Sequence, residues 1–309
     1  MADQTTIRVA LDWTPNTLHT GLILALKRRL YAARNLNVLI QPPDPSYTTT
    51  PAKQLEQGTA DLAICPSESC IAYAETGKMQ LQAIYALLQK DGASAIVSAA
   101  SNERVGKVGD LEKGVYGSYA AKYEDGIVKY VVSKDGGDGG KMSVDQGKRK
   151  LGLFDAVKRG ECDATWVFMP WEGVEAEMEG VGLRAFRLED YGVPYGYSPV
   201  VARKVGDGGL SDEVLRQFVE ATREGYALAI SEVEAGPGVL EDLIEPAKSV
   251  EFLKKSQESI NGFYSDGSER LGLMKRGKWT QWLEWLKEQG VLGAELDVDK
   301  LFTNEFNVA

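Results

Sequence analysis

The chain has 309 residues and a formal net charge of −10, from 45 acidic and 35 basic side chains, and this charge excludes nucleic acid as an expected partner because it repels phosphate. Its three cysteines form no CxxC pair, which indicates neither a disulfide framework nor a zinc site, and its single histidine, His19, excludes a histidine-based triad or a multi-histidine metal site. No apolar run approaches the roughly 20 residues that cross a bilayer, which excludes direct membrane insertion.

Strand-like runs alternate with helical patterns through the first two thirds of the chain, which is typical of an α/β fold with largely parallel sheets. The sequence predicts strands at 6–11, 37–41, 61–65, 81–88, 94–99, 114–117, 163–168 and 198–203. Leucines at every fourth position predict one buried helix face, made of Leu18, Leu22, Leu26 and Leu30. Further helices are expected at 67–75, 124–132 and 154–159, and the prolines between 42 and 51 indicate a loop or a late helix start.

The last third of the chain is expected to be mainly helical. Ser211 can cap a helix over 212–230, and a second helix over 278–289 ends at Gly290. The apolar face of that second helix is interpreted as core and contains Trp279, Trp282, Leu283 and Leu286. A glycine-rich stretch at 136–140 lacks the GxxxxGK[ST] spacing and is acidic, so we interpret it as a surface loop.

Aromatic residues gather in segments placed at strand ends, where ligands bind in such sheets: Trp13, Tyr47, Tyr119, Tyr123, Trp166, Trp171, Tyr195 and Tyr197. Flat rings with a few fixed polar groups suit a planar ligand, although each ring alone is more often structural. His19 is either a hydrogen-bonded structural residue or a ligand contact. Glu172 could accept hydrogen bonds from an aminopyrimidine, but a solvated glutamate at a helix start is equally ordinary.

Five segments, in order along the chain, resemble the thiamine-pyrimidine family, which contains bacterial formylaminopyrimidine-binding proteins and fungal pyrimidine-precursor synthases. They are LDWTPNTLHTGL (11–22), GTADLAI (58–64), DATWVFMPWEGVE (163–175), YGVPYGYSPV (191–200) and FTNEF (302–306). The resemblance implies a two-lobed type 2 periplasmic-binding-protein fold, α/β in class, with a hinge of two crossovers near 93–98 and 199–203. Lobe one would comprise residues 1–95 and 203–309, and lobe two residues 96–202.

Positions that match the family's motifs imply ligand contacts from Trp13, His19, Glu124, Trp166, Trp171, Glu172 and Tyr195. To this predicted ligand-binding set we add three residues of neighbouring segments, Tyr47, Ser67 and Tyr119. The synthases carry a lysine that holds pyridoxal phosphate and, four residues later, a histidine that is consumed, and the corresponding residues here are Cys65 and Ser69. Neither can do that chemistry, so we expect no cofactor, no metal and no catalytic residue of the synthase type.

The leading hypothesis is therefore non-covalent binding of a small heteroaromatic ligand, a thiamine-related aminopyrimidine, by a transport receptor or carrier, with a membrane transporter as partner in the first case. A divergent thiamine-pyrimidine biosynthetic enzyme is the alternative, and a regulatory module with a vestigial cleft is a third. The chain enters its first strand without a signal-like segment, so a cytoplasmic location is expected for it as given, and a periplasmic one where a signal peptide has been removed.

Overall fold

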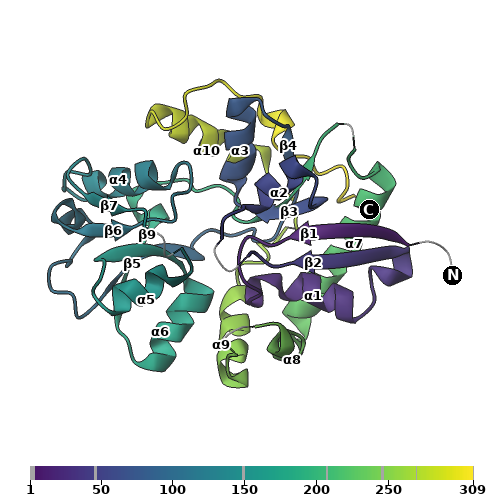
Figure 1. Cartoon of the computed structure of the whole chain (residues 1–309), viewed down its shortest axis with the longest axis horizontal. Coiled ribbons are helices and arrows are strands. Elements are labelled where there is room, and N and C mark those ends of the chain that lie inside the picture. Colours follow the sequence, from purple (N-terminus) through teal and green to yellow (C-terminus); the bar gives the residue numbers. More distant parts are fainter. Residues whose placement is uncertain are drawn as a thin grey trace.

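The computed structural model describes residues 4–44, 47–147, 150–206, 208–244, 247–268 and 270–308. It contains two five-stranded sheets, each covered by helices, which form two lobes lying side by side (Figure 1). The predicted two-lobed α/β architecture is thereby confirmed. None of the helices in the described ranges is long and apolar enough to cross a membrane.

The first sheet has the strand order β2-β1-β3-β10-β4. Its strands are β1 (Thr5–Ala10), β2 (Leu36–Gln41), β3 (Leu62–Cys65), β4 (Leu81–Ala86) and β10 (Val200–Lys204). Strand β1 pairs in parallel with β2 and β3, because helices carry the chain back between these strands. The helices of this lobe include α1 (Thr20–Lys27), α2 (Pro51–Gln57), α3 (Ser67–Thr76) and α7 (Asp212–Ser231), which Ser211 caps as predicted.

The second sheet has the order β7-β6-β8-β5-β9. Its strands are β5 (Ser94–Ala99), β6 (Val115–Gly117), β7 (Ser143–Asp145), β8 (Ala164–Phe168) and β9 (Leu183–Arg187). The accompanying helices are α4 (Glu124–Lys134), α5 (Leu153–Lys158) and α6 (Val174–Glu179). The sequence did not predict β7, β9 or α6, because each is short and lacks a clear apolar period.

The sheets are largely parallel as expected, but each contains one strand that runs against its neighbours. Strand β5 is antiparallel to β8 and β9, and β10 is antiparallel to β3 and β4. Both strands directly follow a passage of the chain from one sheet to the other, over 87–93 and over 188–199. The lobe boundaries at 95/96 and 202/203 remain predictions.

The predicted leucine stripe is buried only in part. Leu26 is 36% exposed, and Leu30 follows the end of the helix. Leu18 and Leu22 are buried as predicted, but Ile23 and Leu24 are buried as well, on other faces of the helix. They are buried because α1 packs against α7 and α8 (Ala235–Leu240), both C-terminal elements whose positions the local sequence does not reveal.

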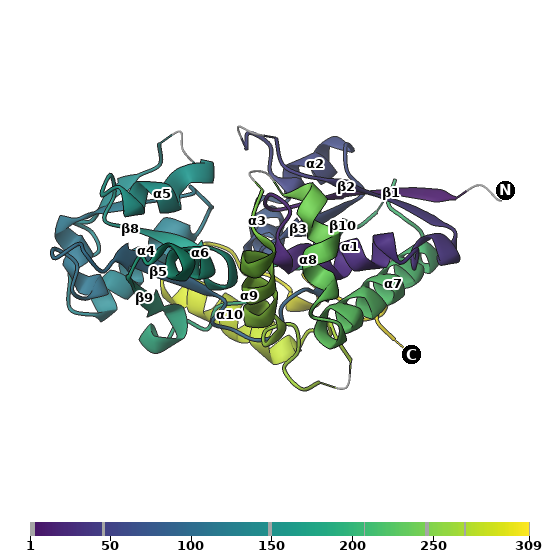
Figure 2. The same cartoon turned by 90° about the horizontal axis from the view of Figure 1, so that it is seen from below.

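Two C-terminal helices, α9 (Val250–Asn261) and α10 (Arg276–Glu288), lie where the lobes meet, α10 at the top and α9 at the bottom of Figure 1, and both on the lower side of Figure 2. Trp282 and Leu286 of α10 share one hydrophobic core with Ile71 of α3 and with Ile127 and Val131 of α4. As predicted, the apolar face of α10 is therefore core, and this core is continuous between the two sheets.

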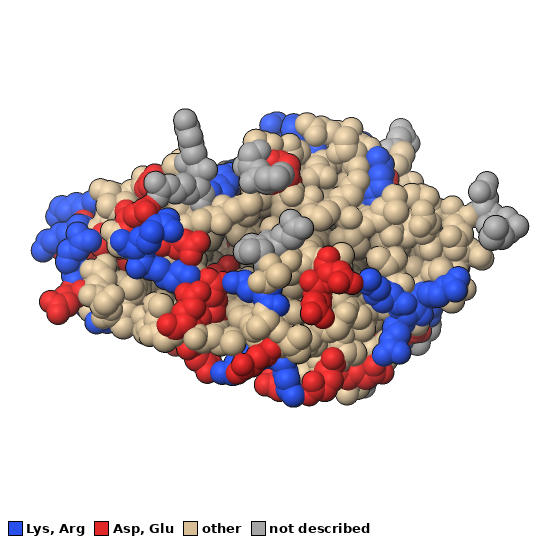
Figure 3. All heavy atoms as spheres, turned by 60° about the horizontal axis from the view of Figure 1, so that its bottom comes forward, with Lys and Arg blue, Asp and Glu red and all other residues tan. Residues whose placement is uncertain are grey.

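Helix α9 makes the corresponding contacts with the segment that follows β8. Phe252 packs edge to face on Trp171 with ring centroids 4.7 Å apart, and the Ser256 hydroxyl donates to the carbonyl of Pro170 at 2.5 Å. Ion pairs to α6 accompany these contacts, such as Lys255 with Glu177 at 3.1 Å. Acidic and basic side chains are correspondingly intermixed on this face of the molecule (Figure 3).

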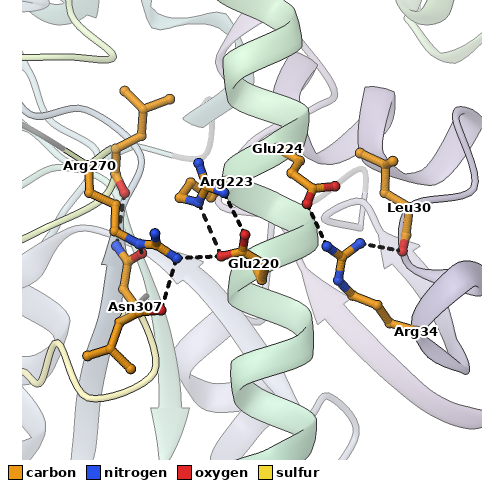
Figure 4. A network of polar contacts seen from close by, with 9 residues as sticks. Leu30, Arg34, Glu220, Arg223, Glu224, Arg270 and Asn307 are labelled. Carbon is orange, nitrogen blue, oxygen red and sulfur yellow. Dashed lines mark hydrogen bonds and ion pairs between the residues drawn. The ribbon is translucent and has the colours of Figure 1, made fainter.

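A polar network fastens the C-terminal tail to α7 (Figure 4). Arg270 donates to the carboxylate of Glu220 at 2.5 Å and to the side-chain oxygen of Asn307 at 2.9 Å. Arg223 binds the other oxygen of Glu220 at 2.5 Å. Asn307 is almost completely buried, so its partners are protein groups rather than water.

Replacing Arg270 by alanine should lower the free energy of unfolding by about 2 kcal/mol, because it leaves the buried side-chain oxygen of Asn307 without its charged donor and removes one of the two arginines that bind Glu220. Urea denaturation measures this loss. The matched control is Arg28→Ala, which breaks an ion pair with Glu232 whose side chains are 54% and 43% exposed, and should cost less than about 0.5 kcal/mol. Equal losses in the two variants would show that the network adds nothing to stability.

Candidate ligand-binding cleft

A cavity of about 410 Å³ lies between the two sheets, a size typical of small-molecule sites. Its walls come from the segments that follow β1, β3 and β6, from the end of β8, and from the passage that leads into β10. Eight of the ten predicted site residues line it: Trp13, Tyr47, Tyr119, Glu124, Trp166, Trp171, Glu172 and Tyr195. Tyr123 lines it as well.

Aromatic rings from both lobes meet in this cavity. Trp13, after β1, lies 5.5 Å from Tyr47 and 5.7 Å from Tyr119 between ring centroids, the latter in an edge-to-face arrangement. Trp166 of β8 lies 5.3 Å from Tyr195. The flat faces of these two ring groups offer apolar contact area that loses little entropy on binding.

Two loops that supply these rings adopt left-handed backbone conformations at residues other than glycine. Tyr47 has a φ of 49° and Ala120 a φ of 59°. Such conformations cost about 1–3 kcal/mol and are common at functional sites. The hydroxyl of Tyr47 donates to the backbone carbonyl of Asp12, which secures the first of these loops against the end of β1.

Glu124 lines the cavity, but protein donors already occupy its carboxylate. One oxygen accepts from the Tyr116 hydroxyl at 2.8 Å and from the Tyr119 amide at 3.1 Å, and the other accepts from the Ala121 amide at 3.2 Å. Burial raises the pKa of Glu124, while these hydrogen bonds oppose the rise. The geometry assigns Glu124 to holding the 119–123 loop in place.

Glu172 keeps more acceptor capacity. It lies in the turn Met169–Gly173 after β8, and its carboxylate accepts from the Phe168 amide at 3.0 Å. Burial raises its pKa to about 7. No basic side chain in the described ranges forms an ion pair with it, so a ligand that donates hydrogen bonds would find an available carboxylate.

The structure adds a residue that sequence reasoning did not single out. Glu68 lines the cavity from the first turn of α3, where the Ser67 hydroxyl donates to it at 3.2 Å. Burial raises its pKa, and the Tyr195 hydroxyl faces it. The sequence feature that could have pointed to Glu68 is its position just after β3. An acidic residue in the first turn of a helix is too common to indicate a binding site by itself.

His19 and Ser67 do not line the cavity. His19 is fully buried, its Nε2 lies 3.0 Å from the Asp12 carboxylate, and the Asn16 amide donates to its Nδ1 at 3.3 Å. Of the two interpretations, the structure supports a hydrogen-bonded structural residue. Ser67 is buried, and its amide donates to the carbonyl of Tyr197, which also lies outside the cavity.

A protein-family model described as NMT1/THI5 like matches residues 16–235. The chain belongs to the NMT1/THI5-like family. It is 23% identical over 295 residues to the formylaminopyrimidine-binding protein of Halalkalibacterium halodurans, covering 91% of this chain and 84% of that one. It is 26% identical over 234 residues to a putative thiamine biosynthesis protein of Haemophilus influenzae, covering 75% and 70%. The periplasmic nitrate-binding protein NrtA of Synechocystis PCC 6803 superposes with a TM-score of 0.73 at 15% identity, covering 98% and 87%.

In the synthases that this chain resembles, a lysine holds pyridoxal phosphate, and the residue at the corresponding position of this cavity does not fit that role. Cys65 and Ser69, at the corresponding positions, both line the cavity, and a thiol cannot form the stable aldimine that a lysine forms. The nearby ammonium of Lys122 is paired with Glu75. Within the described ranges, no group of three His, Cys, Asp or Glu side chains could hold a metal ion.

Proposed function

We propose that this protein binds a thiamine-related aminopyrimidine, non-covalently, in the cleft between its lobes. The observation that carries the proposal is the combination of Glu172, a partly buried carboxylate with free acceptor capacity, and aromatic rings contributed by both lobes to one cavity. The formylaminopyrimidine-binding relative, which aligns over most of both chains, supports the choice of ligand.

The chemistry of an aminopyrimidine matches this lining. Its exocyclic amine presents N–H donors, which a carboxylate accepts, and its flat ring can stack on Trp13 or Trp166. The carboxylates of the cavity oppose an anion such as the nitrate for which the structural neighbour NrtA is named. A ring with amine donors therefore suits the site better than an anionic ligand does.

The same proposal includes a role in transport. The two-lobed fold is shared with a periplasmic nitrate-binding protein, and this supports a receptor that delivers its ligand to a membrane transporter from the periplasm. The cytoplasmic location and a carrier role remain the alternative expectation.

Calorimetric titration tests the proposed ligand. We expect the hydroxymethyl and formylamino pyrimidine precursors of thiamine to bind, and the same ring without its exocyclic amine to bind at least about 30-fold more weakly. Trp13→Ala should weaken both rings alike, because stacking does not depend on the amine. Failure of every aminopyrimidine to bind would overturn the proposal, and chemical conversion of a bound ligand would favour the alternative enzyme.

A further inference from the structure

The cavity carries more negative than positive charge. Among the residues that the structure describes, four carboxylates line it, those of Asp12, Glu68, Glu124 and Glu172, and two ammonium groups, those of Lys122 and Lys150. Glu124 is buried and the other three carboxylates are partly buried. Withdrawing a carboxylate from water is unfavourable unless a positive charge or hydrogen bonds replace its hydration.

Neither ammonium group compensates these carboxylates. Lys122 pairs with Glu75, which does not line the cavity, and the ammonium of Lys150 lies 6.0 Å from the centre of the Tyr47 ring. In the described ranges, Glu68 and Glu172 form no ion pair with any basic residue. Their hydrogen-bond donors are neutral groups: the Ser67 and Tyr195 hydroxyls for Glu68, and the Phe168 amide for Glu172. A positive charge in the ligand would supply the charge that the described lining of the cavity lacks.

The ring groups of the same cavity also favour positive charge. Trp13, Tyr47 and Tyr119 form one group and Trp166 and Tyr195 the other. The face of an aromatic ring is electronegative, and rings gathered around a site are a recurrent means of binding organic cations. Carboxylates on both lobes and rings on both lobes thus favour the same class of ligand.

From these contacts we propose that the cleft selects a heteroaromatic cation, a flat ligand with a positive charge on a ring nitrogen, over a neutral ring of the same shape. The inference rests on the proposed function because it concerns the same cleft. It restricts the expected ligands to those that carry a positive charge. Glu172 from the second lobe and Glu68 from the first lie close to the charge and make the selection, whereas Glu124 stays committed to its loop.

The test compares two ligands that differ in charge alone. Thiamine joins an aminopyrimidine to a permanently charged thiazolium ring, and its isostere with a thiophene in place of the thiazolium is neutral. In calorimetry with the full chain at pH 8, we expect thiamine to bind about 30-fold more tightly, the size expected of a desolvated cation–π contact. Binding of the neutral isostere with equal or greater affinity would overturn the inference.

Variants assign the selectivity to named groups. Glu68→Gln should reduce the preference for the charged ligand about tenfold, whereas Glu177→Gln, on the exposed side of α6, should leave it unchanged. An unchanged preference in Glu68→Gln would contradict the role of Glu68. N-methylpyridinium, a cation without a pyrimidine, separates the two proposals. If it binds and no aminopyrimidine does, the proposed function fails and the charge inference stands. If aminopyrimidines bind but charge has no effect, only the charge inference fails.

Discussion

Replacing Glu172 by glutamine should weaken the binding of an aminopyrimidine by about 30- to 1,000-fold. The carboxylate only accepts hydrogen bonds, whereas the glutamine amide presents an N–H group that would face the donor of the ligand. A buried donor facing a donor costs about 2–4 kcal/mol, which gives this range at 1.4 kcal/mol per decade. Calorimetry of the variant with aminopyrimidine precursors measures the loss. Unchanged affinity would remove Glu172 from the site.

The raised pKa of Glu172 also predicts how ligand affinity and stability depend on pH. Burial raises the pKa of Glu172 from an ordinary 4.5 to about 7 in the folded protein, with Glu175 adding to the rise and Lys248 opposing it. Ligand affinity should therefore increase between pH 5 and pH 8, as the accepting carboxylate ionises. The stability of the free protein should change in the opposite direction. Because its pKa is raised, Glu172 binds its proton more tightly in the folded state than in the unfolded state. The stability that this protonation contributes is complete below about pH 4.5 and is lost as the pH rises to about 7.

Glu172→Gln lacks this decline, and at pH 8 it should be more stable than the parent by up to about 3 kcal/mol, at 1.36 kcal/mol per pKa unit. Glu175→Gln is the matched control three residues away. Burial raises the pKa of Glu175, but hydrogen bonds from Lys158 and Lys248 outweigh it and lower the pKa, so this variant should be less stable than the parent at pH 8. Urea denaturation at pH 5 and pH 8 measures both variants, and the same sign for both would contradict the assignment.

Trp282→Ala should destabilise the protein by about 3–5 kcal/mol, the usual cost of deleting a fully buried large ring. Trp282 has no exposed surface, stacks on Trp285 with centroids 5.4 Å apart, and lies edge to face with Tyr195 at 5.3 Å. Ligand affinity should fall as well, because Tyr195 lines the cavity and loses its support.

Thermal or urea denaturation measures the loss in Trp282→Ala, and two controls frame the result. Trp282→Phe keeps a ring in the core and should lose less than half as much stability. Trp13→Ala removes a cavity ring that is partly exposed, and should affect affinity far more than stability. A loss below about 1 kcal/mol in Trp282→Ala would show that α10 does not hold the lobes together as described.

Several parts of the fold and the site followed from local patterns. The strands are apolar runs between turn residues, so the sequence alone could place Trp13 and Glu172 each just after a strand, at a sheet edge where ligands bind, although the two strands belong to different sheets. The resemblance supplied the two-lobed arrangement. The residues that sequence reasoning placed wrongly or missed depend on distant contacts: Leu26 is exposed because α7 and α8 pack on other faces of α1, and Glu68 matters only through its position opposite Tyr195.

The strand order also sets a sequence of events during synthesis. The second sheet is built from one continuous stretch, from Ser94 to Arg187, so it can form as soon as that stretch has left the ribosome. The first sheet cannot, because β10 must be inserted between β3 and β4. Until Val200–Lys204 emerges, both of those strands present unpaired edges to solvent. We expect the nascent chain to depend on chaperones during this interval, and we expect them to bind mainly its first 90 residues.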